Sequence, residues 1–530
     1  MTLRASIWSI MIRLDEIRQK LLKRRQSYWW LFTGLIVVYL ISRLLWLNRF
    51  PPFLDELLHI GRAIMFRLGN FGVGFSEGKW LATTMIAAFS ALPGEYLWEA
   101  RLVSVMSGLI STVGLFLIGK ALFTIRVGLL AVLFYVIIPY ALFFDRLALT
   151  DGIVVTFGIW IVFVTIKLIG SENGMLSVLL ATLLMLSFLT KAPAMIFITI
   201  PPLAIIILIP FGQWLHATKK ILPAMIGSAI VLLVLLLRGY GSENFRGKYE
   251  INIGKSLLLS LYSNGSMVLD WGWRMLTPPL AVLSLLAVGW SLIIDRSRSK
   301  LFLISLLIIT IGPYLLIAKT FYPRYLLFAL VPISLLLSCF VSWLLDGLLT
   351  LTDGRPRFKV LALALLVLLL AWPLFLDYQI LMSPERAALP ALIRWQYFEG
   401  WPSGYGVRQL AEYLSTEAKE MENEQLTVVR PFMGGQVYGS GLDLYLQTSE
   451  NLLLEVIGPD PEISRASLAG WLGQGHRVLI VADTTNPTGM AVIEQVSPYL
   501  KVEQIWFYPK PASDRGFVVW EVDQGMIEVP

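Results

Sequence analysis

The sequence predicts a polytopic α-helical membrane protein followed by a C-terminal soluble α/β domain. Of its 530 residues, 56% are hydrophobic and 15% are charged, which is unusual for a soluble domain. Apolar runs of about 20 residues recur along most of the chain, and each is long enough to cross a hydrocarbon core of roughly 30 Å. Residues 379–530 carry 10 Lys and Arg against 19 Asp and Glu, whereas the preceding part is strongly basic. This charge division predicts two domains.

About eleven apolar runs predict membrane spans, and the fifth and sixth form a tight hairpin broken at Lys191–Pro193. The spans lie near 28–48, 98–119, 126–144, 148–169, 175–190, 192–211, 220–238, 277–294, 300–318, 324–345 and 358–378. We therefore expect a basic N-terminus over 1–27, a transmembrane domain over 28–378 and an α/β domain over 379–530.

The distribution of basic residues predicts the orientation of these spans. If the basic N-terminus is cytoplasmic, the short loops that return to the cytoplasm are basic, as the positive-inside rule requires. They contain Lys120, Arg126, Lys219, Lys220, Arg296, Arg298, Lys300, Arg355, Arg357 and Lys359. One cytoplasmic loop, with Lys167 and Glu172, follows the rule less well. The long segments 49–97, 239–276 and the tail then lie outside, in a multi-pass plasma-membrane protein. The net charge of +7 is thus a membrane pattern and predicts no nucleic-acid partner. The single cysteine, Cys339, allows no disulfide within the chain.

Local patterns predict further elements outside the spans. Two helices with apolar faces are expected near 55–69 and 79–91, in the interface plane of the membrane. In the tail, Gly406–Glu420 predicts a helix, and further helical patterns lie near 464–473 and 488–500. Strands are expected at Leu426–Pro431, Leu442–Leu446, Leu452–Ile457, Val478–Ala482, Val502–Tyr508 and Phe517–Val522.

An acidic pair follows the first span. Asp55 and Glu56 stand at an expected helix start, with His59 one helical turn beyond Asp55. A carboxylate here would serve as general base on an acceptor hydroxyl. Alternatively, Asp55 merely caps the helix. Asp55 and His59 also leave a divalent metal site open, although two ligands alone do not establish one.

Further charged residues fall on the same, outer side. Arg146 and Asp151 lie between the third and fourth spans, where Asp151 either caps a helix or serves a site. Arg146 is suited to bidentate phosphate binding. Lys191 stands at the hairpin turn, where it either faces a phosphate or merely extends its ammonium to the membrane interface. Lys319, Tyr322, Arg324 and Tyr325 stand at the start of the tenth span, and the two cations among them are better explained by a phosphate clamp than by topology. The turn Gly400–Gly406 is either an aromatic sugar platform or a plain connector.

Acids beside cations at a membrane surface suit transfer from a lipid-linked phosphate. The cations stabilise the leaving phosphate while an acid activates the acceptor. Each motif taken alone is weak evidence. The inference of a transferase rests on the predicted topology, which places all of these charged residues on the same side of the membrane.

With these residues placed, the chain resembles the GT-C glycosyltransferases, specifically the protein mannosyltransferase and aminoarabinose transferase type. The resemblance covers most of 28–378 and rests on Leu54–Glu56 with His59, Arg146–Asp151, Leu189–Lys191 and Pro323–Leu327. The tail, with Trp401–Gly406, is similar to that of bacterial members.

The resemblance implies inverting transfer from a polyprenyl-phosphate sugar to an extracytoplasmic lipid, glycan or protein acceptor. Asp55, Glu56 and Asp151 would then be catalytic, with Lys191 and Arg324 near the lipid phosphate. Some relatives carry a Lys directly after the acidic pair, where this chain has Leu57, so phosphate binding must rely on other cations. Relatives differ in metal use.

Two other classes of function compete with this one. A transporter or lipid flippase usually places polar sites near the midplane, whereas the charges here gather at one rim. A membrane scaffold without activity, whose tail binds a partner, is the second alternative. Loss of activity on changing Asp55 alone would exclude the scaffold.

Overall fold

The computed structural model describes residues 26–243, 257–318, 320–351, 356–421, 425–431, 441–446, 451–458, 460–496 and 501–523. Contacts divide the chain into two compact units. The helical unit comprises Met1–Leu45, Gly74–Ala82 and Leu102–Leu381. The tail unit comprises Trp46–Val73, Thr83–Arg101 and Met382–Pro530. Most of the loop 49–97, which we expected to accompany the transmembrane domain, thus packs with the tail.

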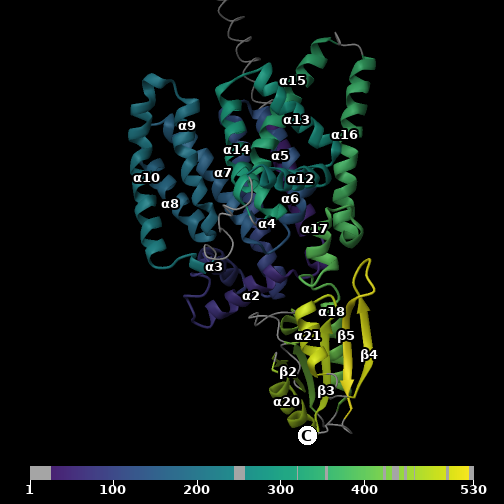
Figure 1. Ribbon diagram of the computed structural model, residues 1–530. Coiled ribbons are helices and arrows are strands. Elements are labelled where there is room, and N and C mark those ends of the chain that lie inside the picture. Colours follow the sequence, from purple (N-terminus) through teal and green to yellow (C-terminus); the bar gives the residue numbers. More distant parts are fainter. Residues whose placement is uncertain are drawn as a thin grey trace, which may run out of the picture. The chain divides into compact units, whose positions relative to one another are not determined.

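Each predicted span coincides with a helical segment (Figure 1). The helices are Gln26–Arg49, α4 (Tyr96–Leu122), α5 (Ile125–Ile137), α6 (Pro139–Phe144), α7 (Thr150–Ile169), α8 (Gly174–Thr190), η2 (Ala192–Thr199), α9 (Ile200–Leu208), α10 (Trp214–Leu237), α13 (Pro278–Ile293), α14 (Arg298–Ile317), η4 (Pro323–Ala329), α15 (Leu330–Leu351) and α16 (Pro356–Met382). The 239–276 connection adds α12 (Leu257–Met275).

Six of the described helices are long and apolar enough to cross a membrane, or seven if α12 and α13, bent by 119°, count as one span. Several predicted spans are broken helices instead. The run 126–144 divides into α5 and α6 at Pro139, and the run 192–211 divides into η2 and α9. A proline lacks the amide that would continue a helix, so breaks near it are expected. The count of about eleven spans remains a prediction.

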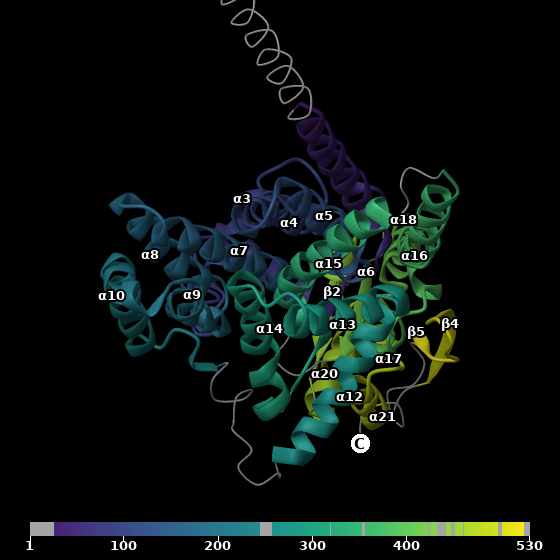
Figure 2. The same ribbon diagram turned by 90° about the horizontal axis from the view of Figure 1, so that it is seen from above.

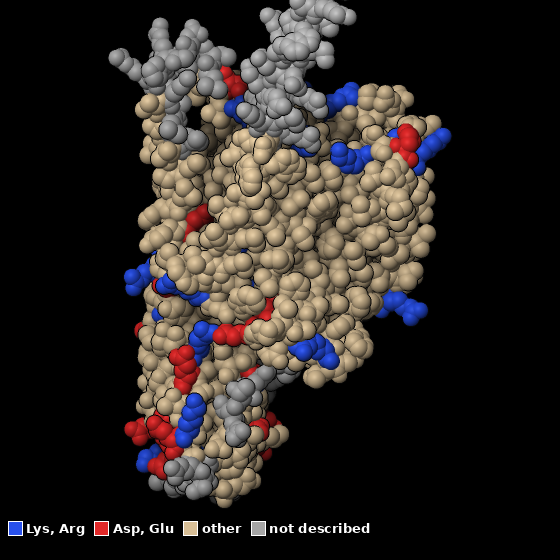
Figure 3. Space-filling model, turned by 180° about the vertical axis from the view of Figure 1, so that it is seen from behind, with Lys and Arg blue, Asp and Glu red and all other residues tan. Residues whose placement is uncertain are grey.

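Close helix contacts organise the helical unit. Helix α4 approaches α5 at two glycines, and a Cβ on Gly119 would stand 2.6 Å from the Gly128 Cα. Helices α7, α8, α9 and α10 lie side by side (Figure 2). Large apolar side chains on α10, such as Leu233 and Leu237, are exposed. Much of the visible face of this unit carries few charged side chains (Figure 3), as a lipid-facing surface requires.

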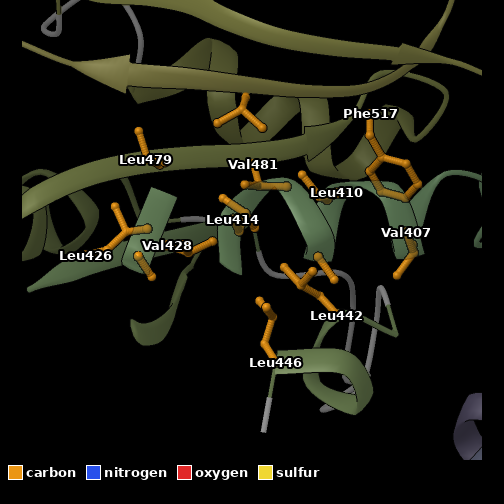
Figure 4. Packing of buried hydrophobic residues seen from close by; sticks show 13 residues of the cluster. Val407, Leu410, Leu414, Leu426, Val428, Leu442, Leu446, Leu479, Val481 and Phe517 are labelled. Atoms are coloured by element: carbon orange, nitrogen blue, oxygen red, sulfur yellow. The ribbon is translucent and has the colours of Figure 1, made fainter. Parts of the chain in front are cut away.

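The tail unit contains a five-stranded sheet in the order β2-β1-β3-β5-β4. Its strands are β1 (Leu426–Pro431), β2 (Leu452–Ile457), β3 (Arg477–Asp483), β4 (Val502–Pro509) and β5 (Gly516–Val522). Strand β1 is parallel to β2 and β3, whereas β5 is antiparallel to β3 and β4. Helix α18 (Val407–Glu420) packs on one face (Figure 4), and α20 (Pro461–Gly473) and α21 (Pro487–Val496) pack on the other.

The predicted pattern of the tail is confirmed for the α18 and α20 helices, five strands and residues 488–496 of α21, with residues 497–500 outside the described part. The strand predicted at Leu442–Leu446 is wrong, because these residues form the short helix α19. Leu442 and Leu446 are both buried, and a spacing of four places them on one helical face. A run of five residues fits both the two-residue period of a strand and the 3.6-residue period of a helix, so the sequence pattern did not distinguish the two.

The two helices predicted in the first loop are α2 (Leu54–Arg67) and α3 (Trp80–Phe89). The start of α2 is joined to the tail by backbone pairing. Phe53 and Ser403 form an antiparallel bridge, and the Leu54 amide donates to the Pro402 carbonyl at 2.9 Å. This pairing is the physical reason that the loop belongs to the tail unit.

Candidate functional site

A cavity of about 490 Å³ lies within the helical unit, and residues of α7, η2, α9, α14 and η4 line it. Asp151, Lys191 and Arg324 line it, together with Tyr325 and with Tyr314, whose ring stacks on that of Tyr325. The remaining wall is mostly apolar and contains Val154, Val155, Pro193, Ala194, Met195, Ile196, Phe197, Ile200, Leu306, Ile309, Pro313, Ala318, Leu327 and Phe328. The cavity thus combines a small polar group with a long apolar surface, a combination typical of ligand sites.

One acid and two cations form the polar group. Lys191 Nζ donates to Asp151 Oδ1 at 2.6 Å, and Arg324 Nε lies 3.8 Å from Asp151 Oδ2. The side chains of Asp151 and Arg324 are 10% and 7% exposed. Because the group carries one more positive than negative charge, it favours an anion in a poorly solvated place.

Aromatic rings hold the two cations in position. Lys191 Nζ lies 4.5 Å from the centroid of the Tyr325 ring. The Arg324 guanidinium lies 4.7 Å from the Tyr322 centroid and 5.6 Å from that of Tyr325. Such cation–π contacts become stronger when water is excluded. The predicted residues Asp151, Lys191, Tyr322, Arg324 and Tyr325 are therefore brought together by the fold.

Helix ends explain this convergence. Asp151 occupies the first turn of α7, where the helix dipole stabilises a negative charge. Lys191 directly follows the last residue of α8, where the dipole stabilises a positive charge. The next residue, Ala192, donates its amide to the Gly78 carbonyl at 3.1 Å. Gly78 has a φ of +68°, and a Cβ there would stand 2.9 Å from Ala192 Cβ. The 74–82 segment thus fixes the turn that carries Lys191.

Arg146 does not line this cavity. Its side chain is fully buried, and Nη1 donates to the Ser42 carbonyl at 3.1 Å. The neighbouring Asp145 accepts from the hydroxyls of Tyr39 at 3.3 Å and Tyr135 at 3.2 Å, with Arg43 Nε 3.6 Å away. These contacts fasten the segment between α6 and α7 to the first helix, and this segment leads directly to Asp151.

The acidic pair lies in the tail unit, at the first turn of α2. Glu56 is fully buried and accepts from Arg101 Nε and Nη2, both at 2.8 Å, in a bidentate pair. Glu56 also accepts from the Phe53 amide at 3.0 Å. Asp55 is half-buried. The two neighbouring acids therefore differ in exposure, because Glu56 is fully buried against Arg101 whereas Asp55 is partly accessible.

Arg101 was missed by sequence reasoning. Besides Glu56, its guanidinium donates to the carbonyls of Leu47, Phe50 and Pro51 at 2.9, 3.0 and 3.0 Å. One signal was present, since an arginine inside an apolar run is costly unless it is paired. Its partners lie 45 or more residues away and could not be read from the run itself.

His59 is buried, and its Nδ1 lies 3.1 Å from Arg62 Nη1. Among the described residues, no group of three or more His, Cys, Asp or Glu side chains could hold a metal ion. Lys319, the other predicted cation, lies outside the described residues.

Comparison with known proteins identifies the fold. A family model described as dolichyl-phosphate-mannose-protein mannosyltransferase matches residues 80–237. A comparison with curated proteins finds no matching sequence. Among solved structures, the chain is similar to ArnT from Cupriavidus metallidurans bound to undecaprenyl phosphate, with a TM-score of 0.57 and 13% identity over 93% of this chain and 98% of that one.

The apo state of the same ArnT matches with a TM-score of 0.56 and 15% identity, covering 94% of this chain and 98% of that one. The oligosaccharyltransferase of Archaeoglobus fulgidus matches with a TM-score of 0.51 and 11% identity, covering 92% of this chain and 74% of that one. The chain is therefore a membrane protein with the GT-C fold, and the predicted GT-C resemblance is confirmed.

Proposed function

We propose that this protein is an inverting glycosyltransferase that moves a sugar from a polyprenyl-phosphate donor to an extracytoplasmic acceptor. The acceptor is a lipid, a glycan or a protein. The proposal includes the predicted topology of about eleven spans, with a cytoplasmic N-terminus and the tail outside.

The cavity of the helical unit carries this proposal. Lys191 and Arg324 supply the positive charge that a phosphate needs, and the mostly apolar lining around them suits an isoprenoid chain. An isolated phosphate site would not need such a wall. The similar fold of ArnT, whose structure contains undecaprenyl phosphate, supports a lipid phosphate as the occupant.

The reaction assigns a role to each group. The acceptor oxygen attacks the anomeric carbon, Asp55 accepts the hydroxyl proton, and the bond from that carbon to the phosphate oxygen breaks. The polyprenyl phosphate leaves with the electron pair, and its negative charge is stabilised by Lys191 and Arg324. Asp151 orients these two cations, with which it pairs at 2.6 and 3.8 Å.

Supporting groups complete the proposed site. Glu56 holds the first turn of α2 through Arg101, which lets Asp55 act from a fixed backbone. Tyr322 and Tyr325 keep the cations in place, and His59 and Lys319 are assigned to substrate binding. Arg146 is assigned to holding the segment before Asp151 rather than to the phosphate, since it is fully buried.

Transfer from a panel of radiolabelled polyprenyl-phosphate sugars tests the proposal, with wild type and Asp55→Asn protein compared in membranes. This change keeps the side-chain size and removes the basic carboxylate. Transfer should fall by roughly 100-fold or more if Asp55 is the general base. Equal transfer by both proteins would refute the assigned role. Movement of labelled lipid between leaflets without any sugar transfer would favour a flippase.

A further inference from the structure

Lys510 is a buried lysine that the proposed reaction does not use. Its side chain has 0% exposure, and its ammonium donates to Asp483 Oδ2 at 2.6 Å. It also donates to the carbonyl oxygens of Gly400 at 2.8 Å and Ser403 at 2.9 Å, and to Thr485 Oγ1 at 3.3 Å. Burying a charge is costly unless all its partners are supplied, so this arrangement needs a reason.

The two carbonyl groups belong to the connector, residues 400–404, which precedes α18. Asp483 is the last residue of β3, and Lys510 directly follows β4. The ammonium therefore ties the connector to the sheet. The sequence of this turn left open whether it contacts a sugar or only connects two elements. In the structure its carbonyl groups accept hydrogen bonds from Lys510.

The connector in turn holds the start of α2. Gly404 donates its amide to the Pro52 carbonyl at 2.8 Å, and the Pro402 carbonyl accepts from Leu54 at 2.9 Å. A Cβ on Gly404 would stand 2.8 Å from the Pro52 oxygen, so only glycine allows this approach. The Phe53 ring also packs at 4.4 Å on Tyr397, whose carbonyl accepts from the Ser403 hydroxyl at 2.8 Å.

Asp55 directly follows the three residues that the connector holds. On the next residue, Glu56 is fixed by Arg101 through two bonds of 2.8 Å. The backbone at Asp55 is thus fixed immediately before it by the connector and immediately after it by Arg101. Of these two anchors, the connector is the one that Lys510 ties to the sheet.

We propose that Lys510 and Asp483 are positioning residues for Asp55, and that the α/β tail serves the reaction by holding the first turn of α2 through the connector. This inference rests on the proposed role of Asp55. It assigns the tail a task in the transfer step, which differs from binding a partner protein. Neither residue touches a reacting atom in this scheme.

Stability and positioning are separated by two variants. In Lys510→Met, Asp483 remains as an uncompensated buried charge, and the thermal midpoint should fall. In the double variant Lys510→Met/Asp483→Leu both charges are gone, so the midpoint should recover. The carbonyls of Gly400 and Ser403 still lack the ammonium donor. A residue needed for stability alone would regain activity in the double variant, whereas a positioning residue would not.

The measurements are kcat and donor KM of the full chain in nanodiscs, together with hydrogen exchange of peptides covering residues 52–56. We expect the double variant to lose roughly 10- to 100-fold in kcat with little change in KM, because small misplacements of a reacting group cost this much. Exchange in the 52–56 segment should rise. Gly404→Ala, which pushes the connector from Pro52 while keeping Lys510, should reproduce both effects.

The control is Arg477→Met/Glu521→Leu, which removes the ion pair between β3 and β5 and with it the pair that Arg477 forms with Glu417 of α18. It should leave kcat and the exchange of residues 52–56 unchanged. Wild-type kcat in both the Lys510 double variant and Gly404→Ala would overturn the inference. Raised exchange in these variants, with no transfer even by wild type, would uphold the positioning contacts and overturn the proposed function instead.

Discussion

Lys191 gives the sharpest test of the cavity as a lipid-phosphate site. Its ammonium is 2.6 Å from Asp151 and 4.5 Å from the Tyr325 ring, and its side chain is only 15% exposed. Lys191→Met keeps an unbranched chain of similar length against the ring and removes only the charge. The substitution therefore tests the electrostatic contribution with little change in packing.

The expected loss follows from the contacts. A hydrogen bond from a charged group contributes about 1.5–3 kcal/mol, which corresponds to roughly a 10- to 100-fold weaker affinity. In the variant, Asp151 also loses its closest counter-charge, and among the described residues Arg324, 3.8 Å away, is the ion-pair partner that remains when the phosphate enters. The double variant Lys191→Met/Asp151→Asn should therefore bind better than the single one, since it removes this repulsion.

The assay is titration of purified protein in nanodiscs with a short-chain polyprenyl phosphate, followed by native mass spectrometry. Lys167→Met is a matched control, because Lys167 lies near another aromatic ring, 5.7 Å from the Phe163 centroid, at the far end of α7 and away from the cavity. Unchanged affinity in Lys191→Met, or an equal loss in Lys167→Met, would refute the assignment of the cavity to the lipid phosphate.

Two further predictions concern packing and buried charge. Gly108→Ala should destabilise the protein by about 1–3 kcal/mol, because its Cβ would stand 2.0 Å from the Tyr39 hydroxyl. Gly227→Ala, in a helical position with nothing within 4 Å of the new Cβ, should instead leave the thermal midpoint unchanged or raise it; equal effects of the two would contradict the close approach. Arg101→Met should cost about 3–5 kcal/mol by leaving Glu56 as a buried charge, and part of this loss should return in Arg101→Met/Glu56→Gln. A thermal midpoint in Arg101→Met equal to that of wild type would show that the pair does not hold the start of α2.

The sequence predicted the helical segments and most of the tail because both depend on local patterns. An apolar run long enough to span a bilayer forms a helix whatever surrounds it, since its backbone groups must bond within the segment. Strands such as Arg477–Asp483 are equally visible in their alternation. The five-residue run Leu442–Leu446 was misassigned, because so short a segment takes its conformation from what packs on it.

Site residues were predictable where a charge stood out from its surroundings. Asp151, Lys191 and Arg324 interrupt apolar sequence on the side where positive charge was unexpected, and the fold brings all three into one cavity. Arg146 has the same appearance in the sequence, yet its side chain is buried against Ser42. Residue type and approximate depth do not determine the direction of a side chain.

The sequence alone therefore determined the class of protein, the helical segments and the charges that needed partners. Only the tertiary structure decided which partners they have. Glu56 pairs with Arg101, 45 residues away, and Lys510 reaches Gly400 across 110 residues. Helical periodicity acts over a few residues, whereas an ion pair forms wherever the folded chain places two groups within about 4 Å in a poorly solvated environment. The fold, and no local sequence pattern, thus determined that the connector of the tail pairs with the start of α2.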